Sequence, residues 1–230
     1  MTKPRIAIFD FSCCEGCQLQ IVNLEEELLD LLGGADVVEW REVMSEQSRD
    51  YDIAIIEGSI TRAEDEERLW MIRGRAKILV ALGACAAIGG VNKLKNNFNL
   101  DEVKKCVYGK NASMPHLETS MTRAVDEVVQ VDYKIHGCPI EKTEFIYVMK
   151  CLLMGKKPEI PEYPVCLECK AKGNPCLWDY EQVCLGPIIR AGCGARCPSA
   201  GFRCFGCRGY IDAPNVTAAK DVIEKYGLKV

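Results

Sequence analysis

Fifteen of the 230 residues are cysteine, and this content constrains the chain more than any other feature of the sequence. The number is odd, so at least one cysteine has no disulfide partner within the chain. The first residues lack the basic head, apolar stretch and small-residue cleavage site of a secretory signal, so we expect a cytoplasmic protein. Disulfides are disfavoured in the reducing cytoplasm. Metal or iron–sulfur ligation is therefore the leading explanation for the cysteines.

Twelve of the cysteines fall by spacing into three sets of four. The first set joins a C-x-x-C motif to two much later cysteines and consists of Cys14, Cys17, Cys85 and Cys138. The second set also starts with C-x-x-C and consists of Cys166, Cys169, Cys176 and Cys184. The third set consists of Cys193, Cys197, Cys204 and Cys207. A C-x-x-C motif lets two thiolates reach one metal or cluster, and a cubane [4Fe–4S] cluster takes four thiolates.

Three cysteines are left over: Cys13, Cys106 and Cys151. We expect Cys106 and Cys151 to be small buried apolar side chains. Zinc is an alternative occupant of the second and third sets, because C-x-x-C pairs also occur in zinc ribbons. The first set is unlike a zinc ribbon, because its members lie so far apart in the chain.

A basic stretch accompanies the third set. Between Gln182 and Tyr210 the chain has no acidic residue and four arginines, Arg190, Arg196, Arg203 and Arg208. Cations near a four-thiolate cluster tune its potential. The alternatives are a solvated basic face or a docking patch for an acidic redox partner.

Short apolar runs alternate with helical patterns in the first part of the chain. The runs typical of buried strands are residues 5–10, 37–40, 51–57, 77–82 and 128–133. Helices are expected at residues 19–32 (stopped by Gly33-Gly34), 61–73 and 140–154. This alternation predicts a doubly wound parallel sheet, in which loops after different strands meet at the carboxyl edge. The cysteines of the first set lie in such loops.

The second part of the chain follows a proline-containing linker at residues 156–164. From Cys166 to Tyr210 no hydrophobic periodicity lasts more than a turn, so this part cannot bury a core of its own. It needs another source of stability, which its eight cysteines can supply as ligands. We therefore expect domains at 1–157 and 158–230, with a short amphipathic helix at 217–226. The net charge of −4 argues against nucleic acid as the main partner, and no apolar run approaches the roughly 20 residues of a membrane span.

Several motifs together resemble one known family. They are Cys14-Glu-Gly-Cys17, the run from Gly83 to Val91, Met114-Pro-His-Leu-Glu-Thr119, Gly137-Cys-Pro139, the run from Gly192 to Pro198, and Cys204-Phe-Gly-Cys207. With them the chain resembles, over nearly its whole length, the small electron-transferring subunit of [NiFe] hydrogenases. The resemblance is best to the cytoplasmic kind, which includes the methyl-viologen-reducing and F420-type enzymes and the sulfhydrogenase delta subunits.

The resemblance implies a flavodoxin-like α/β domain that carries one cluster, followed by a small irregular iron–sulfur domain that carries two. The first set would ligate the proximal cluster, the third set the medial cluster and the second set the distal cluster, giving three [4Fe–4S] clusters. Periplasmic relatives have a three-iron medial cluster and lack a cysteine where Cys197 stands, so Cys197 implies a full cubane. Close backbone approach to ligands favours glycine, and the glycines beside the cysteines are Gly16, Gly83, Gly137, Gly192 and Gly194.

The resemblance also implies the partners. Hydrogen would be split or formed at a nickel–iron site on a large subunit, and electrons would leave to an acceptor subunit that is a flavin or iron–sulfur protein. Glu15 would be a candidate for a proton path; its simpler role is a surface carboxylate or a salt bridge to the large subunit.

Two other functions stay open. One is a complex I-type quinone-reducing subunit, because a tandem pair like Cys13-Cys14 also occurs in that subunit, where both cysteines ligate one cluster. We favour Cys14 and Cys17 as the ligands in this chain, with Cys13 as a spare. The other alternative is a zinc-stapled interaction module. His136 has a ligand or proton role or, more simply, a structural one, and His116 is expected to cap or pack at a helix start.

Overall fold

The structure is a computed structural model that describes residues 3–109 and 118–225. The chain divides into two compact units, Met1–Lys157 and Pro158–Val230, which we call unit 1 and unit 2. Within the described ranges, no helix has the length and apolar character needed to cross a membrane.

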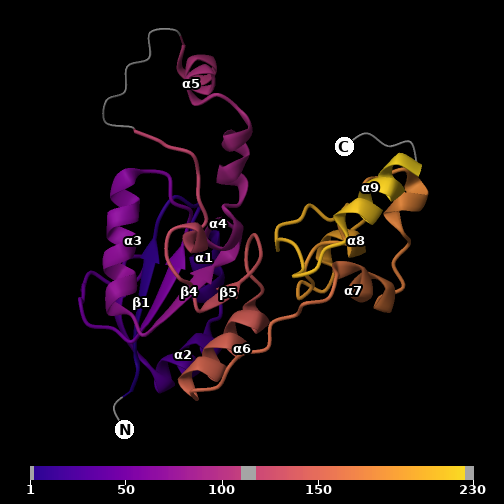
Figure 1. The fold of residues 1–230 in the computed structure, drawn as a ribbon. Helices are drawn as coiled ribbons and strands as arrows, with labels where there is room; N and C mark the ends of the chain where they lie inside the picture. The colour runs from indigo at the N-terminus through magenta and orange to yellow at the C-terminus, as the bar shows by residue number, and fades with distance from the viewer. Residues whose placement is uncertain (1–2, 110–117, 226–230) are drawn as a thin grey trace. The chain divides into compact units, whose positions relative to one another are not determined.

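Unit 1 is built on a five-stranded parallel sheet (Figure 1). Its strands are β1 (Arg5–Asp10), β2 (Asp36–Trp40), β3 (Ile53–Glu57), β4 (Ile78–Leu82) and β5 (Tyr133–Ile135). Their order across the sheet is β2-β1-β3-β4-β5, which is the flavodoxin-like order. The expected α/β fold is confirmed.

The helices of unit 1 are α1 (Gly16–Val22), α2 (Glu26–Gly34), α3 (Ala63–Arg75), α4 (Gly83–Ile88), α5 (Leu100–Tyr108) and α6 (Lys142–Leu153), with 3₁₀ turns η1 (Val91–Asn97) and η2 (Val125–Glu127). Helices α1, α2 and α6 pack on one face of the sheet and α3 packs on the other, whereas α5 and η1 bury no residue. One apolar core lies between the sheet and α1, α2 and α6. The other lies between the sheet, α3 and the segment around η2. Alternate strand residues serve the two cores, as the two-residue period of a strand requires.

Two sequence expectations about the helices and strands of unit 1 are wrong. The single helix at 19–32 is instead two helices, α1 and α2, because the chain breaks at Glu25, whose φ of +54° is not helical. The strand at 128–133 is instead loop, and β5 begins only at Tyr133. The valines 128, 129 and 131 pack against the second core as loop residues, so their apolar character reflects burial and not pairing.

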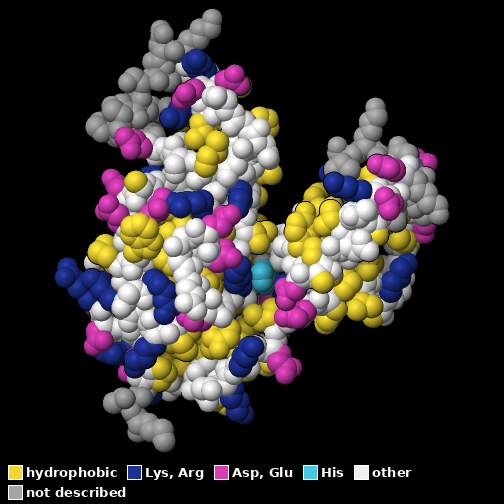
Figure 2. All heavy atoms as spheres, viewed as in Figure 1, with side chains coloured by type: hydrophobic (Ala, Val, Ile, Leu, Met, Phe, Trp, Pro, Cys, Tyr) yellow, Lys and Arg dark blue, Asp and Glu magenta, His cyan; other side chains and the backbone are white. Residues whose placement is uncertain are grey.

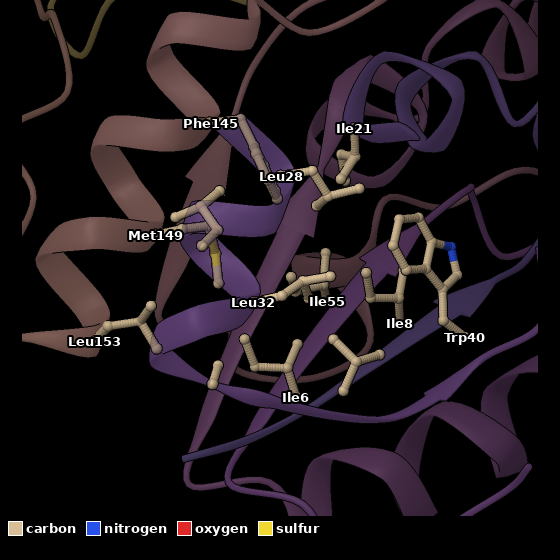
Figure 3. Close-up of a pocket in the computed structure, with 13 residues that line it drawn as sticks. Ile6, Ile8, Ile21, Leu28, Leu32, Trp40, Ile55, Phe145, Met149 and Leu153 are labelled. Carbon is tan, nitrogen blue, oxygen red and sulfur yellow. The ribbon is translucent and has the colours of Figure 1, made fainter. Parts of the chain in front are cut away.

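A small cavity of about 30 Å³ lies in the first core (Figure 3). Its lining side chains come from β1, β2, β3, α1, α2 and α6 and are all apolar, with Trp40 and Met149 among the largest. Water in a cavity needs polar partners, and this lining offers no polar side chain apart from the indole N–H of Trp40. That N–H donates to Gln18 Oε1 at 2.8 Å, so the cavity belongs to the packing of the core.

Asp52 ties together the amino ends of three neighbouring strands. Its carboxylate accepts the backbone N–H of Arg5 at 2.9 Å and pairs with Lys77 Nζ at 2.8 Å. These bonds, with Lys77 first, lower the pKa of Asp52 from its usual 3.8 to about 2. The ionised form of Asp52 therefore stabilises the folded state.

A prediction follows for Asp52→Asn. The stabilisation by Asp52 is present above its usual pKa and is lost as the pH falls from about 4 to about 2, because the unfolded chain protonates first. At neutral pH the variant should lose about 1–2 kcal/mol, after allowance for partial exposure of the ion pairs. The measurement is the difference in unfolding free energy between variant and wild type against pH. Asp36→Asn, at an exposed strand end, is the control; an Asp52→Asn difference that persists at pH 2 would contradict the prediction.

In its described residues, up to Lys225, unit 2 consists of short elements around a small core. They are α7 (Val165–Ala171), η3 (Leu177–Tyr180), α8 (Arg196–Ser199) and α9 (Val216–Lys225). Its buried core includes Val165, Trp178 and Ile188 together with Cys184 and Cys204. Cys184 and Cys204 are thus part of the buried core of unit 2. Figure 2 shows that exposed apolar side chains also cover much of the visible face of this unit.

Two arginines of the basic stretch are structural. Arg208 is only 1% exposed and donates its Nε–H to the carbonyl of Ala191 at 2.7 Å. Arg190 is also buried; it donates to the carbonyl of Pro161 at 2.8 Å and pairs with Asp212. A solvated basic face is therefore wrong for these two, whereas Arg196 and Arg203 are exposed.

Candidate functional site

The loops that follow four strands of unit 1 meet at the carboxyl edge of the sheet. The loops after β1 and β3 are joined by backbone hydrogen bonds between Ser12 and Ser59, at 3.0 and 3.2 Å. The start of α4, directly after β4, is joined to the loop after β5 by the N–H of Ala84, which donates to the carbonyl of Gly137 at 2.7 Å. The cysteines of the first set lie in these loops or at the starts of α1 and α4.

The four thiols of the first set are electrostatic neighbours. The pKa of Cys85 is raised to about 11, first by burial and then by the neighbouring thiols of Cys138 and Cys14. The pKa of Cys138 is raised by burial and then by Cys14. Burial also raises the pKa of Cys17, with a smaller contribution from Cys138. The fold thus brings together side chains that are up to 124 positions apart, Cys14 and Cys138.

Glycines lie against the sulfur atoms of this set. A Cβ on Gly83 would lie 2.4 Å from Cys17 Sγ, and a Cβ on Gly90 would lie 3.0 Å from Cys85 Sγ. Gly83 also has a φ of +79°, which favours glycine. The backbone therefore approaches the thiols closely, as it does around a group held by several thiolates. Four thiols in such a cradle fit an iron–sulfur cluster.

Glu57, the last residue of β3, supports the first cysteine set through hydrogen bonds to its backbone. Its side chain is buried, and its two carboxylate oxygens accept the backbone N–H groups of Cys17 at 3.0 Å and Gln18 at 3.1 Å. Burial raises the pKa of Glu57, although these two hydrogen bonds act in the opposite direction. Sequence reasoning missed Glu57; the available signal was a single acid at the end of the otherwise apolar strand Ile53–Glu57.

Glu15 is held in the left-handed region, with a φ of 60°, between two cysteines of the first set. Its carboxylate pairs with Arg41 at 3.2 Å, and Arg41 also pairs with Asp10 at 2.9 Å. The salt bridge that Glu15 makes in this chain is therefore internal. A role in proton transfer stays a prediction.

The spare cysteines and the histidines differ in their surroundings. Cys13 lies near the first set: burial raises its pKa to about 12, and Cys85 contributes. Cys151 is buried in α6, as expected, but the expectation that Cys106 is buried is wrong. Cys106 lies on α5, which has no buried residue. His136 is buried after β5, whereas His116 lies outside the described residues.

The second set is gathered in unit 2 around α7, which carries Cys166 and Cys169. Burial raises the pKa of Cys166 to about 11, and the thiols of Cys184, Cys169 and Cys176 contribute in that order. A Cβ on Gly186 would lie 3.2 Å from Cys166 Sγ. All four members are thus neighbours, and a glycine again lies against the sulfur.

The third set adjoins the second. Burial raises the pKa of Cys204 to about 12, with contributions from the thiols of Cys184, Cys207 and Cys193. The N–H of Cys204 also lies 3.3 Å from Cys184 Sγ and donates to it. Cys197, the fourth member of the third set, lies in α8. Among the described side chains, no three His, Cys, Asp or Glu lie close enough to hold a single metal ion.

Comparison with known proteins places the chain in a family. Residues 14–152 match the family described as "NADH ubiquinone oxidoreductase, 20 Kd subunit". The sulfhydrogenase 2 subunit delta of Pyrococcus furiosus is 35% identical, over 96% of this chain and 92% of that protein. The matching subunit of the vhu F420-non-reducing hydrogenase of Methanococcus voltae is 32% identical, over 91% of this chain and 83% of its own length. The iron-sulfur subunit of the F420-non-reducing hydrogenase of Archaeoglobus profundus is 29% identical, over 86% and 79%.

A solved structure agrees in fold. A chain of the NAD+-reducing [NiFe]-hydrogenase in the H2-reduced state has a TM-score of 0.61 and 28% identity, over 70% of this chain and 96% of that one. Together with these relatives, the fold and its thiol-bearing loops identify the chain as a subunit of an oxidoreductase. The chain belongs to the family of the 20-kDa subunit of NADH ubiquinone oxidoreductase and, within it, to the hydrogenase small subunits.

Proposed function

We propose that this chain is the electron-transfer small subunit of a [NiFe] hydrogenase. It links H₂ oxidation, or proton reduction, at a nickel–iron site on a large subunit to an acceptor subunit. The observation that carries the proposal is the gathering of the first set: thiols from separate loops become neighbours at the carboxyl edge of the sheet. Sites in such sheets form at this edge, and the catalytic metal belongs to the partner chain.

The residues fit three [4Fe–4S] clusters. The first set of cysteines would hold the cluster nearest the large subunit, the third set the medial cluster and the second set the distal cluster. When bound, these clusters supply one-electron carriers. The chain's own residues bury the thiols, hold the backbone close to them at Gly83 and Gly90, and fix the first loop through Glu57. Glu15, between two of these ligands, is the proposed start of a proton path.

Exposed groups beside the first set support a partner at this edge. Cys14 and Cys138 are exposed in the isolated chain. Apolar side chains on α1 and η1 are exposed as well: Leu19 is 52%, Leu94 60% and Val91 67% exposed. An exposed apolar area with functional groups in it is typical of a protein interface. We propose that the large subunit covers it, in a cytoplasmic complex with a flavin or iron–sulfur acceptor subunit.

The proposal is tested by hydrogen-dependent dye reduction. The chain is purified anaerobically with the subunits that bind it, and reduction of a viologen dye under H₂ is compared with reduction under argon. We expect reduction only under H₂ and only with the large subunit present. Quinone reduction that does not depend on H₂ would contradict the proposal and favour the complex I type.

The tandem Cys13-Cys14 gives a prediction that separates these two types. Cys13 lies close enough to Cys85 for their charges to interact, so it is the residue a complex I-type site would recruit. If Cys14 and Cys17 are the ligands, Cys13→Ser should keep the full iron content, whereas Cys14→Ser should lose most of about four irons per chain. Iron analysis of the two variants measures this. Loss of iron in Cys13→Ser as well as in Cys14→Ser would contradict this assignment and fit the complex I type, in which both tandem cysteines are ligands.

A further inference from the structure

Glu168 has an unexpected set of contacts in unit 2. In the sequence it lies between Cys166 and Cys169, the C-x-x-C of the second set. Its carboxylate, however, is bonded to the loop of the third set. Oε1 accepts the N–H of Gly192 at 2.8 Å, and Oε2 accepts the N–H of Ala195 at 3.1 Å. These two N–H groups flank Cys193 and Gly194.

Two side chains that follow Glu168 in the sequence, Lys172 and Asn174, also bond to the third-set segment. Lys172 Nζ, just after α7, donates to the carbonyl of Gly194. Asn174 Nδ2 donates to Ser199 Oγ at the end of α8, at 2.9 Å, and lies 3.7 Å from Cys169 Sγ. The segment that carries the first two cysteines of the second set therefore holds the third-set loop at several points.

The loop that is held has a backbone that needs support. Gly194 has a φ of +61° and Ala195 a φ of +49°, so two consecutive residues are left-handed. For a residue with a Cβ such as Ala195, this conformation is strained. A carboxylate that accepts N–H groups on both sides of the turn offsets this strain, because hydrogen bonds to charged groups are stronger than those between neutral groups. The turn also sets where Cys193 and the start of α8, with Cys197, lie.

We infer that Glu168 is a positioning residue for the third cysteine set and not for the set in which it lies. It fixes the turn that carries Cys193 and leads into Cys197. Side chains of the α7 segment thus hold the backbone of the third site in position. This inference rests on the proposed function only for the nature of the group that the third set binds; the contacts that carry it belong to the chain alone.

The experiment compares Glu168→Ala and Glu168→Gln with wild type in the anaerobically purified complex. Reference variants Cys166→Ser and Cys193→Ser identify which paramagnetic signal belongs to which set. Lys170→Ala is the matched control, because Lys170 is exposed on the same helix. Three quantities are measured: iron per chain, the midpoint potential of each signal, and amide hydrogen exchange of residues 190–200.

In Glu168→Ala we expect the third-set signal to weaken or be lost, the second-set signal to stay, and exchange of residues 190–200 to rise. Glu168→Gln keeps one acceptor and the side-chain shape but removes a negative charge. The third-set signal should therefore remain, with its midpoint potential shifted to more positive values. A merely structural role would not move the potential. Lys170→Ala should leave the third-set signal, its midpoint potential and the exchange of residues 190–200 unchanged; because Lys170 acts on the Cys166 thiol, the second-set potential is not part of this control.

The inference is overturned if Glu168→Ala weakens the second-set signal and spares the third, or if exchange of residues 190–200 and both signals are unchanged. Wild-type chain that carries zinc and no sulfide would instead refute the proposed function. In that case the exchange measurement still decides whether Glu168 holds the loop.

Discussion

Replacing Gly83 by alanine is expected to abolish the first cysteine site and to leave unit 2 intact. The new Cβ would lie 2.4 Å from Cys17 Sγ, a separation that forces the sulfur or the backbone to move. The φ of +79° at Gly83 adds about 1–2 kcal/mol of strain for any residue with a Cβ. Because the α4 start also carries Cys85, the shift displaces two ligands at once. Iron content should fall from about twelve to about eight per chain.

The matched control is Gly74→Ala. Gly74 lies near the end of α3, and a Cβ there would meet no atom within 4 Å. Alanine is favoured over glycine in a helix by up to about 1 kcal/mol, so this variant should keep all its iron and be slightly more stable. Full iron in Gly83→Ala, with unchanged hydrogen-dependent dye reduction, would mean that the Cys17 sulfur does not bind at this site.

Glu57→Ala should produce the second large effect. The carboxylate is 2% exposed and is the acceptor for the N–H groups of Cys17 and Gln18. Its removal leaves two buried donors without this acceptor, and each such loss costs about 1–3 kcal/mol. Relief from burying a carboxylate offsets part of the cost, so we expect a loss of about 2–4 kcal/mol. For a chain of this size the unfolding midpoint should fall by roughly 5–15 °C.

Two variants bracket this result. Glu57→Gln keeps one acceptor oxygen and should lose less stability than Glu57→Ala. Glu64→Ala, at an exposed position in the first turn of α3, should change stability by no more than about 0.5 kcal/mol. Thermal unfolding under anaerobic conditions at one scan rate measures all three. Equal midpoints for Glu57→Ala and Glu64→Ala would show that Glu57 does not support the Cys17 loop.

The sheet was predictable because its strands are short apolar runs separated by helical patterns. Residues 5–10, 37–40, 51–57 and 77–82 correspond within two residues to β1, β2, β3 and β4. The break at Glu25 was not predictable, because a left-handed φ at a residue other than glycine leaves no local signal. The strand expected at 128–133 was wrong because burial of the valines at 128–131 against a core gives these loop residues the same apolar character as a strand.

The cysteine sets could be grouped from spacing, and the structure makes most members of each set neighbours. The ligand roles of these cysteines stay a prediction. The supporting carboxylates could not be found in the same way. Glu57 reaches Cys17 from 40 positions away, and Glu168 reaches Gly192 from 24 positions away. Such contacts depend on how loops pack, and sequence spacing does not encode that packing.

The central claim is that the three cysteine sets hold iron–sulfur clusters. Its most direct test is the content of iron, acid-labile sulfide and zinc in the anaerobically purified complex. We predict about twelve irons and about twelve sulfides per chain of this protein, after subtraction of the iron contributed by its partners. Stoichiometric zinc in place of iron, with no sulfide, would contradict the claim.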